Sequence, residues 1–365
     1  MELYVIIFLI ITNIVCLFFL LNYKRKHKKD NQFYLKRQFN EVLNSLQQAI
    51  LLFDKDNNLL FYNLYAGDVF SLKDKDLGKK ANKIFKNEQF NEPIKKGQKH
   101  NFFEINYLNK IFDVQIYKVK KTFTKNNVST LIILNNVTEE RKIEETKKDF
   151  FSHASHELKS PLTAILGYSE LVKLEMVKPE EYEDLVTRIY NQALHMSLLV
   201  DDMSTLSKLE TITEKEELYE TVSLNKILKD VIYTLESFLN EKEIKLNISE
   251  EKIDYKCIEL DINKLFKNLI ENAIKYSHKN SKIDIRLFKK DNYITFEVAD
   301  EGIGIQEKHI ERIFGRFYRV DKGRIEKGTG LGLAIVKHTV IKYNGQIDVK
   351  SKLNEGTTIK VTLKA

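Results

Sequence analysis

The chain has 365 residues, which leaves room for two or three domains. Its 59 basic side chains exceed its 52 acidic ones, giving a formal net charge of +7. The two cysteines, Cys16 and Cys257, lie far apart in the sequence, which excludes a disulfide framework and a cysteine metal site.

The first predicted element is a membrane-spanning helix. Residues 3–21 contain no charged side chain, and at about 1.5 Å per residue they extend roughly 28 Å, enough to cross the hydrocarbon core. No Lys or Arg precedes this segment and no small-residue cleavage site follows it, which argues against a cleaved signal peptide. We therefore expect a single transmembrane helix within residues 1–23.

Residues 24–41 are expected to form a basic juxtamembrane helix or linker. Five cations stand directly behind the apolar segment: Lys24, Arg25, Lys26, Lys28 and Lys29. Without them, 54 basic side chains face 52 acidic ones. This distribution places everything after residue 23 in the cytoplasm of a cell-membrane protein. It also makes anionic lipid headgroups, not nucleic acid, the expected partner of the excess charge.

Residues 42–137 change to strand patterns. Five strands are predicted, at 49–53, 59–62, 103–107, 112–116 and 130–136. A turn-prone segment, 54–58, separates the first two, and a helical, loop-rich stretch over 63–96 separates the pair from the other three. Two strands, small helices and a three-strand meander resemble a PAS sensory domain, an α+β fold. The resemblance lies in the order of elements.

Residues 138–215 are predicted to form an antiparallel helical hairpin. A charged helical segment, 138–148, continues into a segment with helical apolar spacing that contains His156. A second helix, over 179–209, carries apolar residues at near-heptad spacing. Two hairpins would bury apolar stripes that a single hairpin leaves exposed, so we expect a homodimer built on a four-helix bundle.

His156 is the candidate nucleophile. It begins the segment HELKSPL, and a largely neutral imidazole has a lone pair that can attack phosphorus. Glu157 can hold the proton of the other ring nitrogen, as an orienter or general base. Pro161 lacks the N–H that would bond to the carbonyl of Glu157, which loosens or bends the helix one turn beyond the histidine. A histidine beside a glutamate is by itself most often an ordinary solvated surface pair. The motifs further along the chain favour a phosphate acceptor over such a pair.

The segment NLIENAIKYS predicts a metal and phosphate site on a helix expected to run from an N-cap at Asp261 to residue 277. Asn268, Asn272 and Lys275 or Tyr276 fall on one stripe of that helix. Polar amides on a mostly buried helix need partners, and Mg²⁺ takes few protein oxygens beside substrate phosphates. We assign Asn272 to the metal, Asn268 to its water shell or the phosphates, and Lys275 to phosphate charge.

The segment DEGIGI predicts an adenine site. Asp300 follows an apolar strand, 294–299, and precedes Gly302 and Gly304. A carboxylate at this place can accept a hydrogen bond from an exocyclic amine, while the glycines let the backbone approach the base closely.

The segment GTGLGL predicts a phosphate-binding loop. Gly328, Gly330 and Gly332 open a helical run over 331–343 that begins with Leu331. This arrangement places backbone N–H groups and the positive helix end against phosphates. A GxGxG pattern alone often marks an ordinary turn, so the order of all the motifs matters.

An aromatic segment lies between the glycine motifs. It contains Phe314, Arg316, Phe317, Tyr318 and Arg319, and the family resemblance described below implies that it begins a lid ending near Lys327. Packing at the root of the lid accounts for the aromatic residues equally well. Arg316 or Arg319 can balance the charge of the γ-phosphate in the transition state, and the sequence leaves open which one does so.

These motifs together resemble a membrane-bound sensor histidine kinase of a bacterial two-component system. The resemblance covers residues 138–365 with specific motifs and the upstream part more weakly. It implies that ATP phosphorylates His156, with Glu157 as its acid or base partner, and that Asp300 reads adenine. It also implies a cytoplasmic response regulator as partner, which receives the phosphoryl group on an aspartate.

The resemblance assigns three further positions. Ser160 stands where the family usually has the threonine or asparagine implicated in positioning water for phosphatase action, and its hydroxyl keeps that activity open. Thr357, with Gly356, matches the last glycine motif of the family ahead of a final strand. His153 stands where asparagine is common and is expected not to accept phosphate.

The predicted organisation is a transmembrane helix (1–23), a juxtamembrane segment (24–41), a PAS-like domain (42–137), a dimerisation and phosphoacceptor domain (138–215) and an ATP-binding domain (216–365). We expect the last to be an α/β sandwich, with helices on one face of a mixed sheet. Two alternatives compete: a catalytically silent dimeric scaffold, and an ATPase of the chaperone or topoisomerase type. The intact acceptor, asparagine and glycine motifs oppose the first, and the HELKSPL segment opposes the second.

Overall fold

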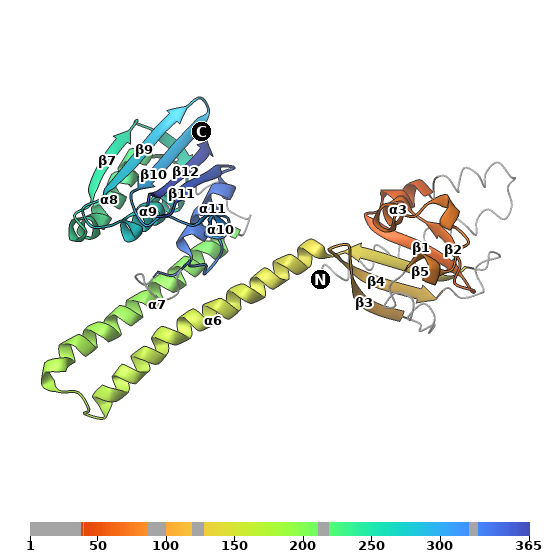
Figure 1. The fold of residues 1–365 in the computed structure, drawn as a ribbon, viewed down its shortest axis with the longest axis horizontal. Coiled ribbons are helices and arrows are strands. Elements are labelled where there is room, and N and C mark those ends of the chain that lie inside the picture. The colour runs from red at the N-terminus through yellow and green to blue at the C-terminus, as the bar shows by residue number, and fades with distance from the viewer. Residues whose placement is uncertain (1–37, 39, 86–99, 119–127, 211–218, 321–327) are drawn as a thin grey trace. The chain divides into compact units, whose positions relative to one another are not determined.

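The computed structural model describes residues 38, 40–85, 100–118, 128–210, 219–320 and 328–365 (Figure 1). It divides into two compact units, Met1–Thr146 and Lys147–Ala365. The predicted transmembrane and juxtamembrane segments lie almost wholly outside the described residues, and so does the tip of the predicted lid, 321–327. Within the ranges given above, no helix has the length and apolar character needed to span a bilayer.

The N-terminal unit contains a five-stranded antiparallel sheet of order β2-β1-β5-β4-β3. Its strands are β1 (Gln48–Asp54), β2 (Leu59–Tyr62), β3 (His100–Tyr107), β4 (Lys110–Lys118) and β5 (Val128–Asn136). All five predicted strands are thereby confirmed. The predicted helical stretch contains α3 (Leu64–Phe70), a short 3₁₀ turn (Asp74–Asp76) and α4 (Ala81–Ile84). Alternate apolar residues of β1, β4 and β5 pack with these helices into one core.

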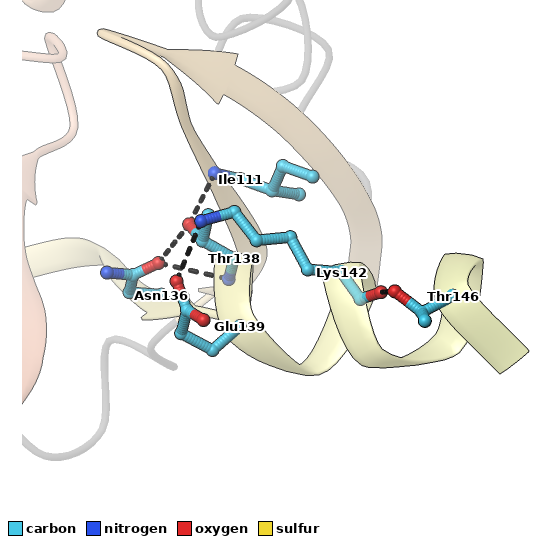
Figure 2. A network of polar contacts seen from close by, with 6 residues as sticks. All are labelled: Ile111, Asn136, Thr138, Glu139, Lys142 and Thr146. Atoms are coloured by element: carbon cyan, nitrogen blue, oxygen red, sulfur yellow. Dashed lines mark hydrogen bonds and ion pairs between the residues drawn. The ribbon is translucent and has the colours of Figure 1, made fainter. Parts of the chain in front are cut away.

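The sheet continues into helix α6 (Thr138–Lys173) through a small polar network (Figure 2). The side-chain oxygen of Asn136 accepts hydrogen bonds from both the backbone N–H and the hydroxyl of Thr138. The Thr138 hydroxyl oxygen in turn accepts the N–H of Ile111 at 2.9 Å, and Val137 donates its N–H to the carbonyl of Ile111 at 2.9 Å. The first turn of α6 is therefore fastened to β4.

Helix α6 runs unbroken from Thr138 to Lys173, which confirms the predicted continuity into the helix of His156. Pro161 lies inside it without ending it. A 3₁₀ turn (Pro179–Glu181) leads into α7 (Tyr182–Glu210), which runs antiparallel to α6 (Figure 1). Several apolar side chains of this hairpin are exposed, among them Phe151, Leu162, Leu166, Tyr190 and Leu198.

The C-terminal part is a two-layer α/β sandwich. Its strands are β6 (Glu220–Ser223), β7 (Lys245–Glu250), β8 (Asp254–Cys257), β9 (Lys282–Lys290), β10 (Tyr293–Asp300), β11 (Gln346–Lys352) and β12 (Gly356–Lys364). Its helices are α8 (Leu224–Glu241), α9 (Glu259–Tyr276), the short α10 (Glu307–Ile310) and α11 (Gly332–Lys342). The main sheet has the order β11-β12-β10-β9-β7, antiparallel except for the parallel pair β7–β9. Helices α8, α9 and α11 share a core with it, so the predicted helices on one face of a mixed sheet are confirmed.

The predicted N-cap of α9 is wrong. The helix begins at Glu259 after Ile258, and Asp261 lies within its first turn. Its buried carboxylate instead accepts hydrogen bonds from Lys342 at 2.6 Å and from the hydroxyl of Tyr343 at 3.0 Å. Both partners come from the end of α11, and a local capping pattern cannot foresee them.

Thr138→Val should loosen the junction between the sheet and α6. It removes the only side-chain acceptor that the described structure gives to the Ile111 N–H, at a cost of about 1 kcal/mol, so that amide should exchange with solvent roughly fivefold faster. Thr146→Val is the matched control, because the Thr146 hydroxyl bonds only to the exposed carbonyl of Lys142. Hydrogen exchange of the full chain measures the difference, and equal rates at Ile111 in both variants would contradict the proposed fastening.

Candidate functional site

An apolar cavity with a carboxylate in its wall lies between α9 and the sheet. Its apolar lining includes Leu269, Ala273, Val298, Ile303, Ile313 and Ile359. One oxygen of Asp300 accepts the N–H of Gly302 at 2.9 Å and that of Thr357 at 3.3 Å. Within the described ranges the other oxygen has no hydrogen-bond partner. Burial raises the pKa of Asp300 to about 6, although the two N–H groups oppose that rise.

Close backbone contacts fix this carboxylate against the end of α9. A Cβ on Gly302 would collide with the carbonyl oxygen of Tyr276, and one on Gly304 would collide with that of Lys352. Gly304 also has φ +64°, which favours glycine. The N–H of Ile303 donates to the same Tyr276 carbonyl at 3.1 Å. These glycines therefore allow close contact with the backbone of Tyr276 and Lys352, and their predicted approach to a base stays a prediction.

A second, polar cavity adjoins the first. The two share Asn272, Tyr276 and Arg319 in their walls. The polar cavity adds Asn268, Lys264, Lys267, Lys275, Gly328, Gly330 and Gly332. A Cβ on Gly332 would collide with the side-chain oxygen of Asn268. The predicted stripe of α9 and the glycine-rich loop thus meet in one place.

The donor set of this cavity suits Mg²⁺ only together with a substrate. In the part of the chain that the structure describes, no group of three or more His, Cys, Asp or Glu side chains is arranged to hold a metal ion. The amide side chains of Asn268 and Asn272 line the cavity. Mg²⁺ typically binds one or two protein oxygens beside substrate phosphates and retains waters. Asn272, with Asn268 nearby, fits that requirement.

The structure separates the two candidate arginines. Arg319 lines both cavities. Arg316 instead pairs with Glu210 at the end of α7, and its guanidinium lies 5.3 Å from the ring centroid of Phe150. The side chain of Leu331 is also turned away from the cavities and is buried in the contact with α7.

The predicted acceptor residues lie outside both cavities. His156, Glu157 and Ser160 are exposed on α6, and none lines either cavity. Across the described residues, no hydrogen bond joins His156 to Glu157. His153, one turn earlier, has its ring 5.9 Å from that of Phe317.

Sequence reasoning missed the part of α7 in the polar cavity. His195 and Asp202 line it, and the hydroxyl of Thr329 donates to Asp202 at 2.7 Å. It also missed Lys242, whose ammonium donates to the carbonyl of Lys275 at 2.7 Å and so fixes the end of α9. The adjacent pair Asp201 and Asp202, which interrupts the apolar spacing of α7, was the only local signal.

Comparison with known proteins decides the family. Residues 146–212 match the His Kinase A (phospho-acceptor) domain, and residues 257–365 match the histidine kinase-, DNA gyrase B- and HSP90-like ATPase family. The phosphate regulon sensor protein PhoR of Pseudomonas aeruginosa is 30% identical over 325 residues, which are 86% of this chain and 71% of that protein. The chain belongs to the sensor histidine kinases of bacterial two-component systems.

Other relatives align over shorter parts of their length. The kinase is 38% identical to the sensor histidine kinase YkoH of Bacillus subtilis over 218 residues, covering 59% of this chain and 47% of YkoH. The kinase therefore spans about half the length of that relative. The solved structure of the Acinetobacter baumannii histidine kinase AdeS aligns with a TM-score of 0.47 at 25% identity, covering 57% of this chain and 97% of AdeS.

Membership of this family makes the chain an ATP-using protein-histidine kinase. Its helical hairpin corresponds to the phosphoacceptor domain and its α/β sandwich to the ATP-binding domain. The ATPase family alone also includes gyrase and HSP90-like proteins, so the phosphoacceptor match is what excludes the chaperone or topoisomerase alternative.

If Asp300 accepts a hydrogen bond from the adenine amine, as the sequence predicts, Asp300→Asn should weaken binding of Mg²⁺ and a non-hydrolysable ATP analogue at least about tenfold, because an amide does not reproduce a charged acceptor. Lowering the pH should weaken binding to the wild type in the same way. With a pKa of about 6, only about a tenth of Asp300 is ionised at pH 5. Titration calorimetry at pH 5 to 8 measures both effects.

Glu301→Gln is the control, since it changes the adjacent exposed carboxylate. The assignment of Asp300 fails if the two variants bind the analogue equally well, or if Asp300→Asn leaves the acid-side loss of affinity intact.

Proposed function

We propose that the kinase transfers the γ-phosphoryl group of ATP to His156 and then to an aspartate of a cytoplasmic response regulator. The observation that carries the proposal is the continuity of the two cavities. One holds a half-buried carboxylate suited to an adenine amine. The other gathers amides, cations and three glycines suited to a polyphosphate, with acidic side chains of α7 and α9 also in its wall. The same chain presents His156 on an exposed helix surface.

The proposed transfer is an in-line displacement. A ring nitrogen of His156 attacks the γ-phosphorus, and a P–N bond forms as the bond to the β,γ-bridging oxygen breaks. The electron pair of that bond leaves with ADP. Glu157 holds the proton of the other ring nitrogen, which keeps the attacking lone pair available. Mg²⁺ held through Asn272 would neutralise phosphate charge.

Two further residues receive roles in this proposal. Arg319 is favoured over Arg316 for the γ-phosphate, because Arg319 lines both cavities while Arg316 is engaged with Glu210. Ser160 lies one turn beyond His156 on the same exposed stretch of α6. Its hydroxyl could position water for dephosphorylation of the response regulator.

The N-terminal unit is proposed to be a PAS sensory domain. The support is the order of its elements: two strands, small helices, then three strands that are neighbours in one sheet. Helix α6 is continuous from Thr138 to Lys173. A shift at its first turn therefore has an uninterrupted helical path to His156.

His156→Gln should abolish autophosphorylation, because the glutamine amide has no basic nitrogen to attack phosphorus. The full chain is incubated with γ-labelled ATP and Mg²⁺, and any label is tested with acid and alkali. The wild type should acquire an alkali-stable, acid-labile label. His153→Gln, which removes the neighbouring histidine one turn away, should keep it.

Acid-labile label that persists in the His156 variant would refute the acceptor. If the wild type binds nucleotide but acquires no label, the silent scaffold becomes the better account. Nucleotide affinity of both variants is measured in parallel to show that they remain folded.

The kinase is also proposed to be a membrane-anchored homodimer, with residues 3–21 as the anchor and the basic cluster at 24–29 on anionic headgroups. The apolar sequence of the first segment supports the anchor, and the exposed apolar side chains of the hairpin support the dimer.

The full chain should sediment with membranes. After extraction in detergent it should be a dimer, as measured by light scattering. A chain lacking residues 1–23 should be released and stay dimeric. A monomer in detergent would refute the dimer, and membrane release of the full chain by salt alone would refute the anchor.

A further inference from the structure

The last third of α7 is bound to the ATP-binding domain of the same chain. Thr329 of the glycine-rich loop donates to Asp202 at 2.7 Å, and Arg316 pairs with Glu210 eight residues later. Between these polar links, Leu206 is buried together with Leu331 and other apolar residues at the start of α11. The contact joins the glycine-rich loop, not only the body of the domain, to the hairpin.

Asp202 lies where a polyphosphate would meet it. Its side chain is in the wall of the polar cavity with Asn268, Lys275 and the loop glycines. Burial raises the pKa of its carboxyl, against the effects of the Thr329 hydrogen bond and of nearby lysines. A carboxylate in this wall repels phosphate groups at the distances inside one cavity.

The loop is also turned toward α7 by its own hydrogen bonds. Thr329 stands between Gly328 and Gly330, so its bond to Asp202 fixes the centre of the loop. The N–H of Leu331 points back to the Thr329 hydroxyl oxygen at 3.3 Å. Phosphate binding at a glycine-rich loop uses such backbone N–H groups. One backbone N–H of the loop is therefore taken by the same hydroxyl that bonds to the hairpin.

We propose that Asp202 is a latch that holds the glycine-rich loop on α7 until the phosphates of a nucleotide displace it. Nucleotide binding and release of the ATP-binding domain from residues 202–210 are then linked, because both require the Thr329 bond to break. The inference deepens the proposed function: it adds how an occupied nucleotide site frees the domain to reach His156.

Asp202→Ala tests the latch directly. Alanine favours the helix and removes the acceptor, so the full chain should bind Mg²⁺ and a non-hydrolysable ATP analogue about tenfold more tightly, the equivalent of one charge-assisted hydrogen bond. Asp201→Ala is the matched control for charge, since it removes the same charge from the adjacent residue, which also lines the polar cavity but makes no bond to Thr329. It should tighten binding clearly less than Asp202→Ala, because it relieves repulsion of the phosphates without freeing the loop.

Two further readouts separate a latch from a change of charge. Adding Thr329→Val to Asp202→Ala should have almost no further effect on affinity, since both changes break the same bond. Backbone amides of residues 202–210 should exchange faster in the wild type when the analogue binds, and should exchange fast in Asp202→Ala without it.

The proposal would be overturned if Asp202→Ala bound the analogue no more tightly than the wild type. It would also be overturned if the amide exchange rates of residues 202–210 changed neither with nucleotide nor with the substitution. These measurements require no phosphoryl transfer. A wild type that never acquires label would therefore refute the proposed function while leaving the latch standing.

Discussion

The buried ion pair between Asp261 and Lys342 fixes how α9 lies against α11, and the nucleotide site depends on that packing. The paired side chains are only 10% and 12% exposed, and Tyr343 donates to the same carboxylate. A buried pair adds little net stability, because desolvation offsets the attraction between the charges. A packing of the two helices that left one of these charges buried without its partner would, however, cost several kcal/mol. The other end of this antiparallel helix pair is where Asn268 meets Gly332.

That packing explains why two cavities of opposite character share one wall. Helix α9 turns an apolar face, with Leu269 and Ala273, toward the sheet and an amide and cationic face toward the glycine-rich loop. Asn272 stands at the boundary of the two. The close approach of the loop to α9 depends on Gly332, because a Cβ there would collide with the side-chain amide of Asn268. A Cβ on Gly328 would meet only the far end of the Lys275 side chain, which can move aside. On the proposed assignment, the amphipathic pattern of one helix would separate a base from its phosphates.

The sequence predicted those features that follow from local periodicity. Alternation identified the strands around Ile105 and Val114, and helical spacing identified the stripe of Asn268 and Asn272. The features it missed depend on residues distant in the chain. Asp261 has the pattern of a cap, but Lys342 arrives from α11 and takes its carboxylate.

Dependence on distant residues also explains why the sequence did not distinguish the two arginines and did not reveal the latch. Arg316 and Arg319 are three residues apart and equally cationic. They differ in their surroundings, because Arg316 pairs with Glu210 while Arg319 lines the cavities. Asp202 gave no more than a break in apolar spacing, and Thr329 carried no signal beyond its place between glycines. Contacts between the hairpin and the ATP-binding domain are set by the packing of Leu206 against Leu331, which no local pattern encodes.

The position of the contact has a consequence for phosphoryl transfer. His156 lines neither cavity, whereas α7 residues do, so the part of the hairpin that meets the nucleotide site comes from α7 and not from the helix of the acceptor. If nucleotide weakens that contact, as proposed, formation of the contact weakens nucleotide binding by the same factor. The pairs Asp202–Thr329 and Glu210–Arg316 would then act on ATP affinity and on domain freedom together. A change in α6 and α7 that disturbs either pair would then alter ATP affinity without any residue of the hairpin having to contact the base.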